Sequence, residues 1–110
     1  MEGLSRYQET IMRVLSDLAE VCTRDGLEIL PVFDAERDNY LVLDAGWAGT
    51  RRIHHIIAHL CIRNGKIWIE VDNTDFQIVE QLLDAGVPKE SIVLAFHSPQ
   101  KRPFTEFAVA

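Results

Sequence analysis

An Asn64-Gly65 pair between two apolar runs constrains the fold more than any other feature of this sequence. Residues 56–63 before the pair and residues 66–72 after it are rich in β-branched and aromatic side chains. Both central residues of a type I′ turn need a positive φ, which asparagine and glycine tolerate, so the pattern predicts a β-hairpin with a two-residue turn. Such a short turn also fixes which residues of the two strands lie opposite each other.

The register that follows from this turn gives the hairpin one apolar and one mixed face. On the mixed face, His59 lies opposite Glu70, which predicts an ion pair, and Cys61 lies opposite Trp68. Because a tryptophan is costly to leave in water, we expect this face to be covered, either by a helix of the same chain or by another protein. The predicted facing pairs of the apolar side are Ile62 and Ile67, Leu60 and Ile69, and Ala58 and Val71.

Two further stretches repeat apolar side chains at helical spacing. Residues 5–24 do so with Ser5 and Gln8 placed for a capping box, which predicts an N-terminal helix that stops at Gly26. After the hairpin the spacing changes again to 3.6 residues, and this predicts a second helix over residues 74–85.

Other segments predict more strands of the same sheet. Residues 27–34 and 40–47 have strand character, and Pro31 places the first of them at a sheet edge or a bulge because proline has no backbone donor. A third strand begins at the Arg51-Arg52 pair, and residues 92–96 form a short buried run. We therefore expect one α+β domain over residues 1–110, an antiparallel β-meander of four or more strands with an N-terminal helix and a C-terminal-half helix packed on it.

Charge and hydropathy argue against a DNA-binding, a membrane-spanning and a secreted protein. With 17 Asp and Glu against 11 Lys and Arg, the net charge is -6, and this repels phosphate, so we expect no direct specific DNA binding. No apolar run is long enough to span a membrane and the N-terminus lacks the pattern of a secretory signal, so we expect a cytoplasmic protein. Cys22 and Cys61 have no CxxC spacing and are expected to be buried thiols.

A metal or catalytic site finds little support in the sequence. His54, His55 and His59 suggest zinc, but on a strand the last two lie about 13 Å apart at ~3.3 Å per residue and the first points to the other face. We therefore expect no metal and no cofactor. The sequence contains no GxSxG, P-loop or GxGxxG motif. The only candidate cluster for a small metal-dependent nuclease-like or other hydrolytic enzyme is His59, Glu70 and Asp72.

Two stretches have the composition of a partner-binding surface. Trp47 stands between glycines and before two arginines, as in an interface hot spot, although it could instead be a lid on the core. The chain ends on apolar residues, which either bind a partner or complete the core. We predict that the bend from Trp47 to Arg52 and the C-terminal segment from Lys101 to Ala110 combine into one partner-binding surface. Its residues are Trp47, Arg51, Arg52, Lys101, Arg102, Phe104, Phe107 and Val109.

Five blocks of the sequence, in this order, resemble the XisI family, the fdxN element excision controlling factors. The chain departs from the family pattern at Ala48, where an acidic or amide residue is typical, and at Cys61, where an aspartate is usual. The blocks are FDAERDNY from residue 33, GWAGTRR from residue 46, GKIWI from residue 65, GVPKESIVL from residue 86 and FTEFAVA from residue 104.

This resemblance implies an accessory protein in programmed, site-specific excision of a DNA element. It implies action beside a serine recombinase and a nuclease-type companion, XisH, and no catalytic activity of its own. The leading hypothesis is a non-catalytic subunit that binds the companion, since an acidic protein suits a basic DNA-processing partner. The alternatives are the hydrolytic enzyme described above and a homodimeric scaffold without a DNA role.

Overall fold

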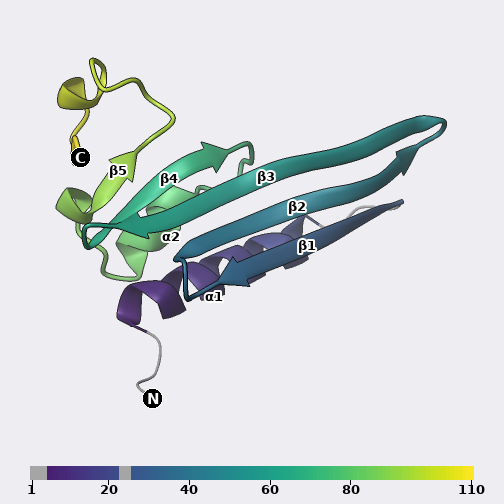
Figure 1. Ribbon diagram of the computed structural model, residues 1–110, viewed down its shortest axis with the longest axis horizontal. Coiled ribbons are helices and arrows are strands. Elements are labelled where there is room, and N and C mark those ends of the chain that lie inside the picture. The colour runs from purple at the N-terminus through teal and green to yellow at the C-terminus, as the bar shows by residue number, and fades with distance from the viewer. Residues whose placement is uncertain (1–4, 23–25) are drawn as a thin grey trace.

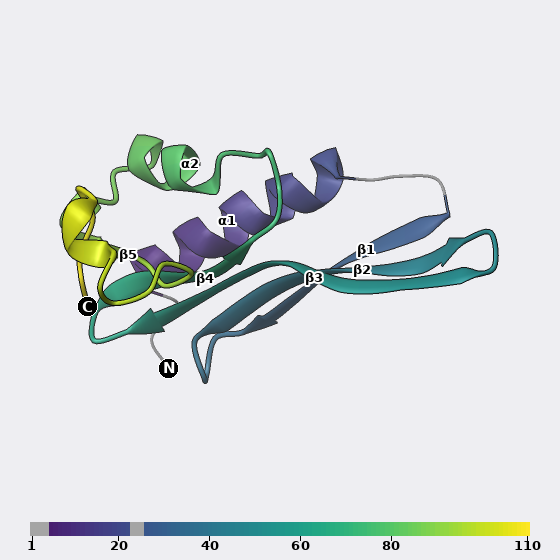
Figure 2. The same ribbon diagram turned by 90° about the horizontal axis from the view of Figure 1, so that it is seen from above.

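A sheet of five strands carries two helices on one face in the computed structural model, which describes residues 5–22 and 26–110 (Figures 1 and 2). Two short 3-10 turns follow the second helix, at Lys89–Ser91 and Arg102–Phe104. The helices and strands are α1 (Arg6–Val21), β1 (Leu27–Asp34), β2 (Asn39–Ala48), β3 (Arg51–Arg63), β4 (Lys66–Asp72), α2 (Ile78–Asp84) and β5 (Ile92–Leu94).

The sheet has the strand order β1-β2-β3-β4-β5, and its first four strands form the predicted antiparallel meander. The α+β fold with an N-terminal helix and a second helix is therefore confirmed. Pro31 lies in β1, an edge strand, as expected. β5 pairs with β4 in parallel, after the chain has crossed over through α2. The sequence showed its buried run but not its partner, because periodicity does not reveal which strand a buried segment joins.

The β3–β4 hairpin has its turn at the predicted place, with φ of 53° at Asn64 and 75° at Gly65. The register shifts between His59 and Leu60, a β-bulge that places His59 opposite Val71. The predicted pairs of His59 with Glu70 and of Ala58 with Val71 are therefore wrong, because the bulge inserts one residue into β4. The predicted pairs closer to the turn are confirmed: Ile62 with Ile67, Cys61 with Trp68, and Leu60 with Ile69.

The N-terminal helix begins as predicted. The Ser5 hydroxyl accepts a hydrogen bond from the Gln8 amide at 3.2 Å, and the Gln8 side chain accepts one from the Ser5 amide at 2.8 Å, which completes the capping box. α1 ends at Val21. The predicted end of this helix falls on residues 23–25, which lie outside the described part of the chain, and Gly26 follows with a left-handed φ of 80°.

The second helix is shorter than predicted, because side chains bind the backbone of the segment before it. The Asp72 carboxylate accepts hydrogen bonds from the Thr74 amide at 3.3 Å and from its hydroxyl at 3.0 Å, and this hydroxyl accepts one from the Phe76 amide at 3.2 Å. These local bonds compete with helical ones. α2 therefore begins at Ile78, after Gln77 with a left-handed φ of 61°.

The core lies between the sheet and the helices. Of the residues expected to be buried, Leu60, Ile67 and Ile69 have no exposed surface, whereas Ile62 and Val71 are half-buried. Burial of one such side chain stabilises the fold by roughly 1.5–3 kcal/mol. The core is formed by Ile11, Val14, Leu15, Leu18, Tyr40, Val42, Ala58, Leu60, Ile67, Ile69, Ile78, Leu82, Val87, Ile92 and Leu94.

Candidate functional site

The β2–β3 hairpin extends past the helices and carries the first predicted interaction stretch at its far end (Figures 1 and 2). Trp47 is 57% exposed there, so it is not a lid on the core. The Arg52 guanidinium lies 5.4 Å from the centroid of the Trp47 ring and donates to the Gly46 carbonyl at 3.4 Å. Arg51 is exposed beside it. This end of the molecule therefore presents an aromatic ring and two guanidinium groups to solvent.

The C-terminal segment covers part of the sheet face that has no helix. The Arg102 guanidinium lies 5.5 Å from the centroid of the Trp68 ring, and the Ala108 amide donates to the Ile92 carbonyl at 2.9 Å. Cys61, opposite Trp68, is 2% exposed. The expectation that this face is covered is confirmed around Trp68, and the cover is the C-terminal segment of the same chain.

Arg102 holds this segment in place through backbone acceptors. Its guanidinium donates to the carbonyls of His97 at 3.1 Å, Ala95 at 3.3 Å and Val109 at 3.5 Å. Three carbonyls from both ends of the segment therefore converge on one cation. A planar guanidinium with several fixed donors suits this arrangement better than a lysine ammonium would. Arg102 is thus an internal structural residue.

The other C-terminal residues predicted to bind a partner divide into two kinds. Phe107 packs against the core and is half-buried. Phe104 is 90% exposed, Val109 is 52% exposed, and Lys101 is exposed. The apolar chain end thus serves the fold through Phe107 and leaves Phe104 in water. Only the exposed members are available to a partner in this conformation.

The two predicted interaction stretches do not form one surface. The hairpin end and the C-terminal segment lie at opposite ends of the molecule in both ribbon views (Figures 1 and 2). The longest dimension of the molecule is 43 Å. A partner that touches both would have to span the length of the sheet.

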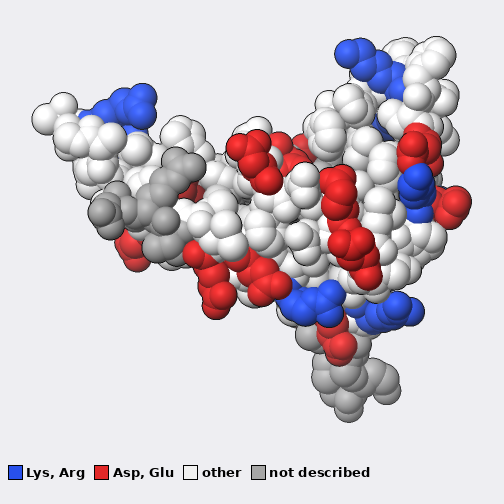
Figure 3. Space-filling model, turned by 180° about the vertical axis from the view of Figure 1, so that it is seen from behind, with Lys and Arg blue, Asp and Glu red and all other residues white. Residues whose placement is uncertain are grey.

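Acidic side chains dominate the side of the molecule that carries the helices. Figure 3 shows this side, with carboxylates spread over the helices and a group of cationic side chains at the hairpin end. The cationic residues at the far end of this hairpin are Arg51 and Arg52. The net charge of -6 is therefore unevenly distributed, since the hairpin end is locally positive.

The three candidate catalytic residues bind different groups. His59 Nε2 lies 3.1 Å from the Asn39 side-chain oxygen. Glu70 lies 3.6 Å from the Cys61 sulfur and 3.8 Å from the Arg63 guanidinium. Asp72 binds the Thr74 backbone and hydroxyl in the turn before α2. The structure therefore shows no contact that joins the three into one hydrogen-bonded group.

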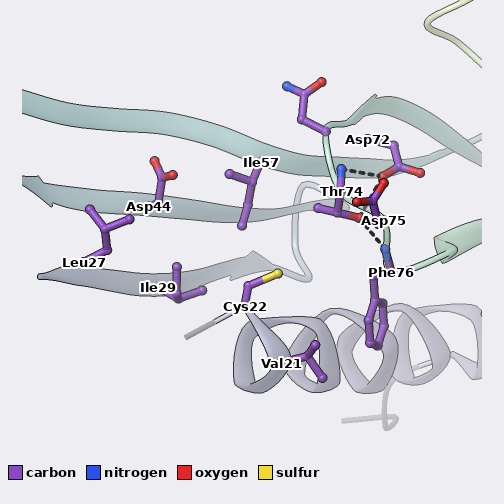
Figure 4. Close-up of a pocket in the computed structure, with 11 residues that line it drawn as sticks. Val21, Cys22, Leu27, Ile29, Asp44, Ile57, Asp72, Thr74, Asp75 and Phe76 are labelled. Atoms are coloured by element: carbon purple, nitrogen blue, oxygen red, sulfur yellow. Dashed lines mark hydrogen bonds between the residues drawn. The ribbon is translucent and has the colours of Figure 1, made fainter. Parts of the chain in front are cut away.

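An open hollow lies between the end of α1, the sheet and the turn that follows β4 (Figure 4). Its volume is about 610 Å³, and it is open to solvent. Carboxylates of Asp44, Asp72 and Asp75 stand on one side of it and apolar side chains on the other. The lining residues are Val21, Cys22, Leu27, Ile29, Asp44, Ile57, Asp72, Asn73, Thr74, Asp75 and Phe76.

Two of these carboxylates have structural partners. Asp44 accepts a hydrogen bond from the His55 amide at 2.8 Å and lies 3.3 Å from the Nδ1 atom of the same residue. Asp72 is bound to Thr74 as described above. Within residues 5–22 and 26–110, no group of three or more His, Cys, Asp or Glu side chains is arranged to hold a metal ion. The same part of the chain contains no helix long and apolar enough to cross a membrane.

Two buried groups have strongly raised pKa values. Burial raises the pKa of the Cys61 thiol to about 11, and the nearby Glu70 carboxylate adds to the shift. Burial likewise raises the pKa of Tyr40 to about 12, with the Asp38 carboxylate, which accepts its hydroxyl hydrogen bond at 2.8 Å, as a further cause. Neither group is ionised at neutral pH, and Cys61 is therefore not a nucleophile under these conditions.

One feature of the site was missed from the sequence, although a signal was present. β3 has 13 residues and β4 has 7, so part of β3 extends beyond its neighbour. The difference in length between the two predicted strands could have revealed this. The carbonyl contacts of Arg102 had no such signal, because they depend on where the C-terminal segment folds.

Comparison with known proteins identifies a family and similar solved structures. The family described as XisI protein matches residues 1–109. A crystal structure of a XisI-like protein from Anabaena variabilis shares 36% identity, with a TM-score of 0.89 over 96% of this chain and 97% of that one. A crystal structure of fdxN element excision controlling factor XisI from Anabaena variabilis shares 43% identity, with a TM-score of 0.83 over 94% of this chain and 96% of that one. No curated protein matches the chain.

Proposed function

The chain belongs to the XisI family, and on this basis we propose that it is a non-catalytic accessory factor that controls the site-specific excision of a DNA element. One observation carries the proposal. This chain shares 43% identity, over nearly its whole length, with a structure named as the fdxN element excision controlling factor XisI. The separate hydrogen-bond partners of His59, Glu70 and Asp72 favour a binding role over the hydrolytic alternative.

We further propose that the factor acts by binding an XisH-type companion protein, beside a site-specific recombinase. The hairpin end, with Trp47, Arg51 and Arg52, is one candidate contact, and the exposed side chains of Lys101, Phe104 and Val109 are another. Exposed aromatic and arginine side chains are the residues that most often anchor protein interfaces. The acidic helix side suits a basic DNA-processing partner.

Direct binding to duplex DNA is not part of the proposed mechanism. A protein with a net charge of -6 that offers Arg51 and Arg52 at one end displaces few counterions from DNA. We expect any binding to be weaker than ~10⁻⁶ M at physiological salt. A gel shift that showed sequence-specific binding at nanomolar concentration would contradict this.

Co-expression with the adjacently encoded companion, followed by gel filtration, tests the proposal. We expect the two proteins to elute together, and Trp47→Ala or Phe104→Ala to weaken the complex without unfolding the protein, since both side chains are exposed. If the proteins elute separately and loss of the factor leaves excision of the element unchanged, the accessory role is wrong. If the protein alone elutes as a dimer and ignores the companion, the homodimeric scaffold is favoured instead.

A further inference from the structure

The half of β3 near the hairpin end has a neighbouring strand on one side only. Pairing with β4 begins at Ala58, and the Ile57 carbonyl accepts a hydrogen bond from the Asn73 amide at 2.9 Å, where the chain leaves the sheet. Residues 51–56 pair with β2 and, within the part of the chain that the structure describes, with no other strand. Such an edge presents a row of backbone donors and acceptors that an extended chain can bind. We call residues 51–56 the free edge.

The other edges of the sheet are less open to an added strand. β1 contains Pro31, which lacks a backbone donor and interrupts any ladder on that side. At the far edge, β5 has a parallel bridge from Val93 to Ala108, so the C-terminal segment already occupies that place. The pairing of the free edge with β2 is regular as well. The register shift of the β2–β3 pair falls between Val42 and Leu43, whose partners are Ala58 and Ile56, so it lies at the end of residues 51–56 and not within them.

The free edge is also positively charged. Its two positive charges are the exposed guanidinium groups of Arg51 and Arg52, and the exposed imidazoles of His54 and His55 offer further ring N–H donors. The nearby carboxylate of Asp44 is only 15% exposed and already binds His55. Arg52 binds a tryptophan ring and a carbonyl, neither of which neutralises its charge. This stretch therefore carries uncompensated positive charge on a chain of net charge -6.

We propose that the free edge takes an extended, acidic segment of a partner protein as an added β-strand. The backbone row supplies the hydrogen bonds. The guanidinium groups of Arg51 and Arg52 lie on opposite faces of the strand, so a carboxylate on either face of the segment meets one of them. A hollow of about 610 Å³ lies beside the edge, lined by residues 54–57 and Asn73, and can receive an apolar side chain of the segment.

A second copy of this chain is a poorer occupant of the edge. Antiparallel pairing of residues 51–56 with themselves would place Arg52 opposite His55 and Arg51 opposite Ile56. The guanidinium groups would then face an imidazole and an isoleucine, so neither would gain the opposite-charge partner that stabilises a strand pair. Duplex DNA would use the same arginines, but it offers no partner for the backbone groups of the edge. An acidic strand supplies both backbone partners for the edge and carboxylates for the arginines.

This inference deepens the proposed function, because it describes how a companion protein would dock at the hairpin end. Its test uses neither the companion nor the DNA element. The two can therefore fail separately: an accessory factor with another docking surface would leave the free edge empty, and a strand-binding edge would remain if the protein had no role in excision.

The experiment is an amide proton–nitrogen correlation NMR titration of the full chain with a peptide of about eight residues in which glutamate and valine alternate. We expect saturable shifts at residues 51–57 and Asn73, and slower hydrogen exchange of amides in residues 51–56. One control peptide carries lysine in place of glutamate, which reverses its charge. Another carries N-methyl groups on alternate amides, which removes its strand hydrogen bonds and keeps its charge. Neither control should bind.

Two double variants test which charges select the peptide. Arg51→Glu/Arg52→Glu should weaken binding by at least about tenfold. Arg13→Glu/Arg37→Glu changes the net charge by the same amount at exposed positions away from the edge, and should leave binding within about twofold. The spectra themselves show whether each variant is folded.

The proposal is wrong if the acidic peptide causes no saturable shifts, or if the N-methylated or lysine peptide binds as well as the acidic one. If both double variants weakened peptide binding equally, the binding would depend only on the net charge of the protein, and the proposal would be wrong as well. Sedimentation that shows self-association lost in Arg51→Glu/Arg52→Glu would assign the edge to a second copy. Binding of a short DNA duplex that depends on these arginines, without binding of the acidic peptide, would assign the edge to DNA.

Discussion

Replacement of Arg102 by alanine should destabilise the protein strongly, although the side chain is partly exposed. The guanidinium donates to three carbonyls at 3.1, 3.3 and 3.5 Å and lies 5.5 Å from the Trp68 ring centroid. Hydrogen bonds to a charged group are worth roughly 1.5–3 kcal/mol each when buried, and partial exposure and the longest bond reduce the sum. We expect Arg102→Ala to lower the free energy of unfolding by about 2–4 kcal/mol.

Thermal melting followed by circular dichroism measures this effect. For a chain of this length, the expected loss lowers Tm by roughly 9–17 °C. Arg102→Lys should fall between the parent and the alanine variant, because it keeps the charge and loses the fork of donors. Lys101→Ala is the matched control, since this neighbour is exposed and should melt within about 2 °C of the parent.

One result would refute the structural role of Arg102. If Arg102→Ala melts within about 2 °C of the parent and loses companion binding, Arg102 acts at an interface, as the sequence alone suggested, and the carbonyl contacts contribute little. A large drop in Tm makes any loss of companion binding by this variant uninformative, so partner mapping should use Phe104→Ala, whose side chain is 90% exposed.

Three further predictions follow from buried groups and one close contact. The pKa of Tyr40 rises from about 10 in the unfolded chain to about 12 in the folded one. Its contribution to the free energy of unfolding is therefore complete below pH 10 and is lost as the pH rises towards 12. The urea midpoint of the parent should fall over this range, and that of Tyr40→Phe should fall less. Cys61 is 2% exposed with a pKa raised to about 11, and we expect mass spectrometry after iodoacetamide treatment near pH 8 to find it unmodified until the protein unfolds. A Cβ atom at Gly46 would lie 2.2 Å from the Gly26 carbonyl oxygen, so Gly46→Ala should cost about 1–3 kcal/mol in urea unfolding.

The parts of the fold that short-range chemistry decides were predictable from the sequence. Asn64-Gly65 gave the turn and the correct pairs nearest to it, as far as Leu60 with Ile69. The error begins at the bulge next to His59, because nothing local in the sequence distinguishes one extra residue in β4 from a regular strand. Thr74 shows the same limit, since the sequence predicts a helix that begins at this residue, whereas its hydroxyl accepts a hydrogen bond from the Phe76 amide in the turn before α2.

The candidate site was less predictable, because exposure depends on how distant segments meet. The sequence selected Phe104 and Phe107 together as one apolar chain end, but the first is 90% exposed and the second packs on the core. Trp47 and Trp68 both lie on sheet strands beside an arginine in space, yet only Trp68 is covered by the C-terminal segment. Composition finds residues that can form an interface, and only tertiary contacts show which of them remain available.

The two ends of the helix-free face of the sheet thus differ in whether the chain covers them. Around Trp68 the chain covers this face with its own C-terminal segment, and substitutions there should change stability first. Towards the hairpin end the face stays open, with Leu30 36%, Ile56 41% and Trp47 57% exposed on neighbouring strands. The exposed part of an apolar side chain gains nothing for the folded state in water, so removal of one of these side chains should cost less stability than removal of a fully buried one such as Leu60. Any large effect of such a substitution on excision would therefore come from a lost partner, and the hairpin end is where binding can be separated from folding.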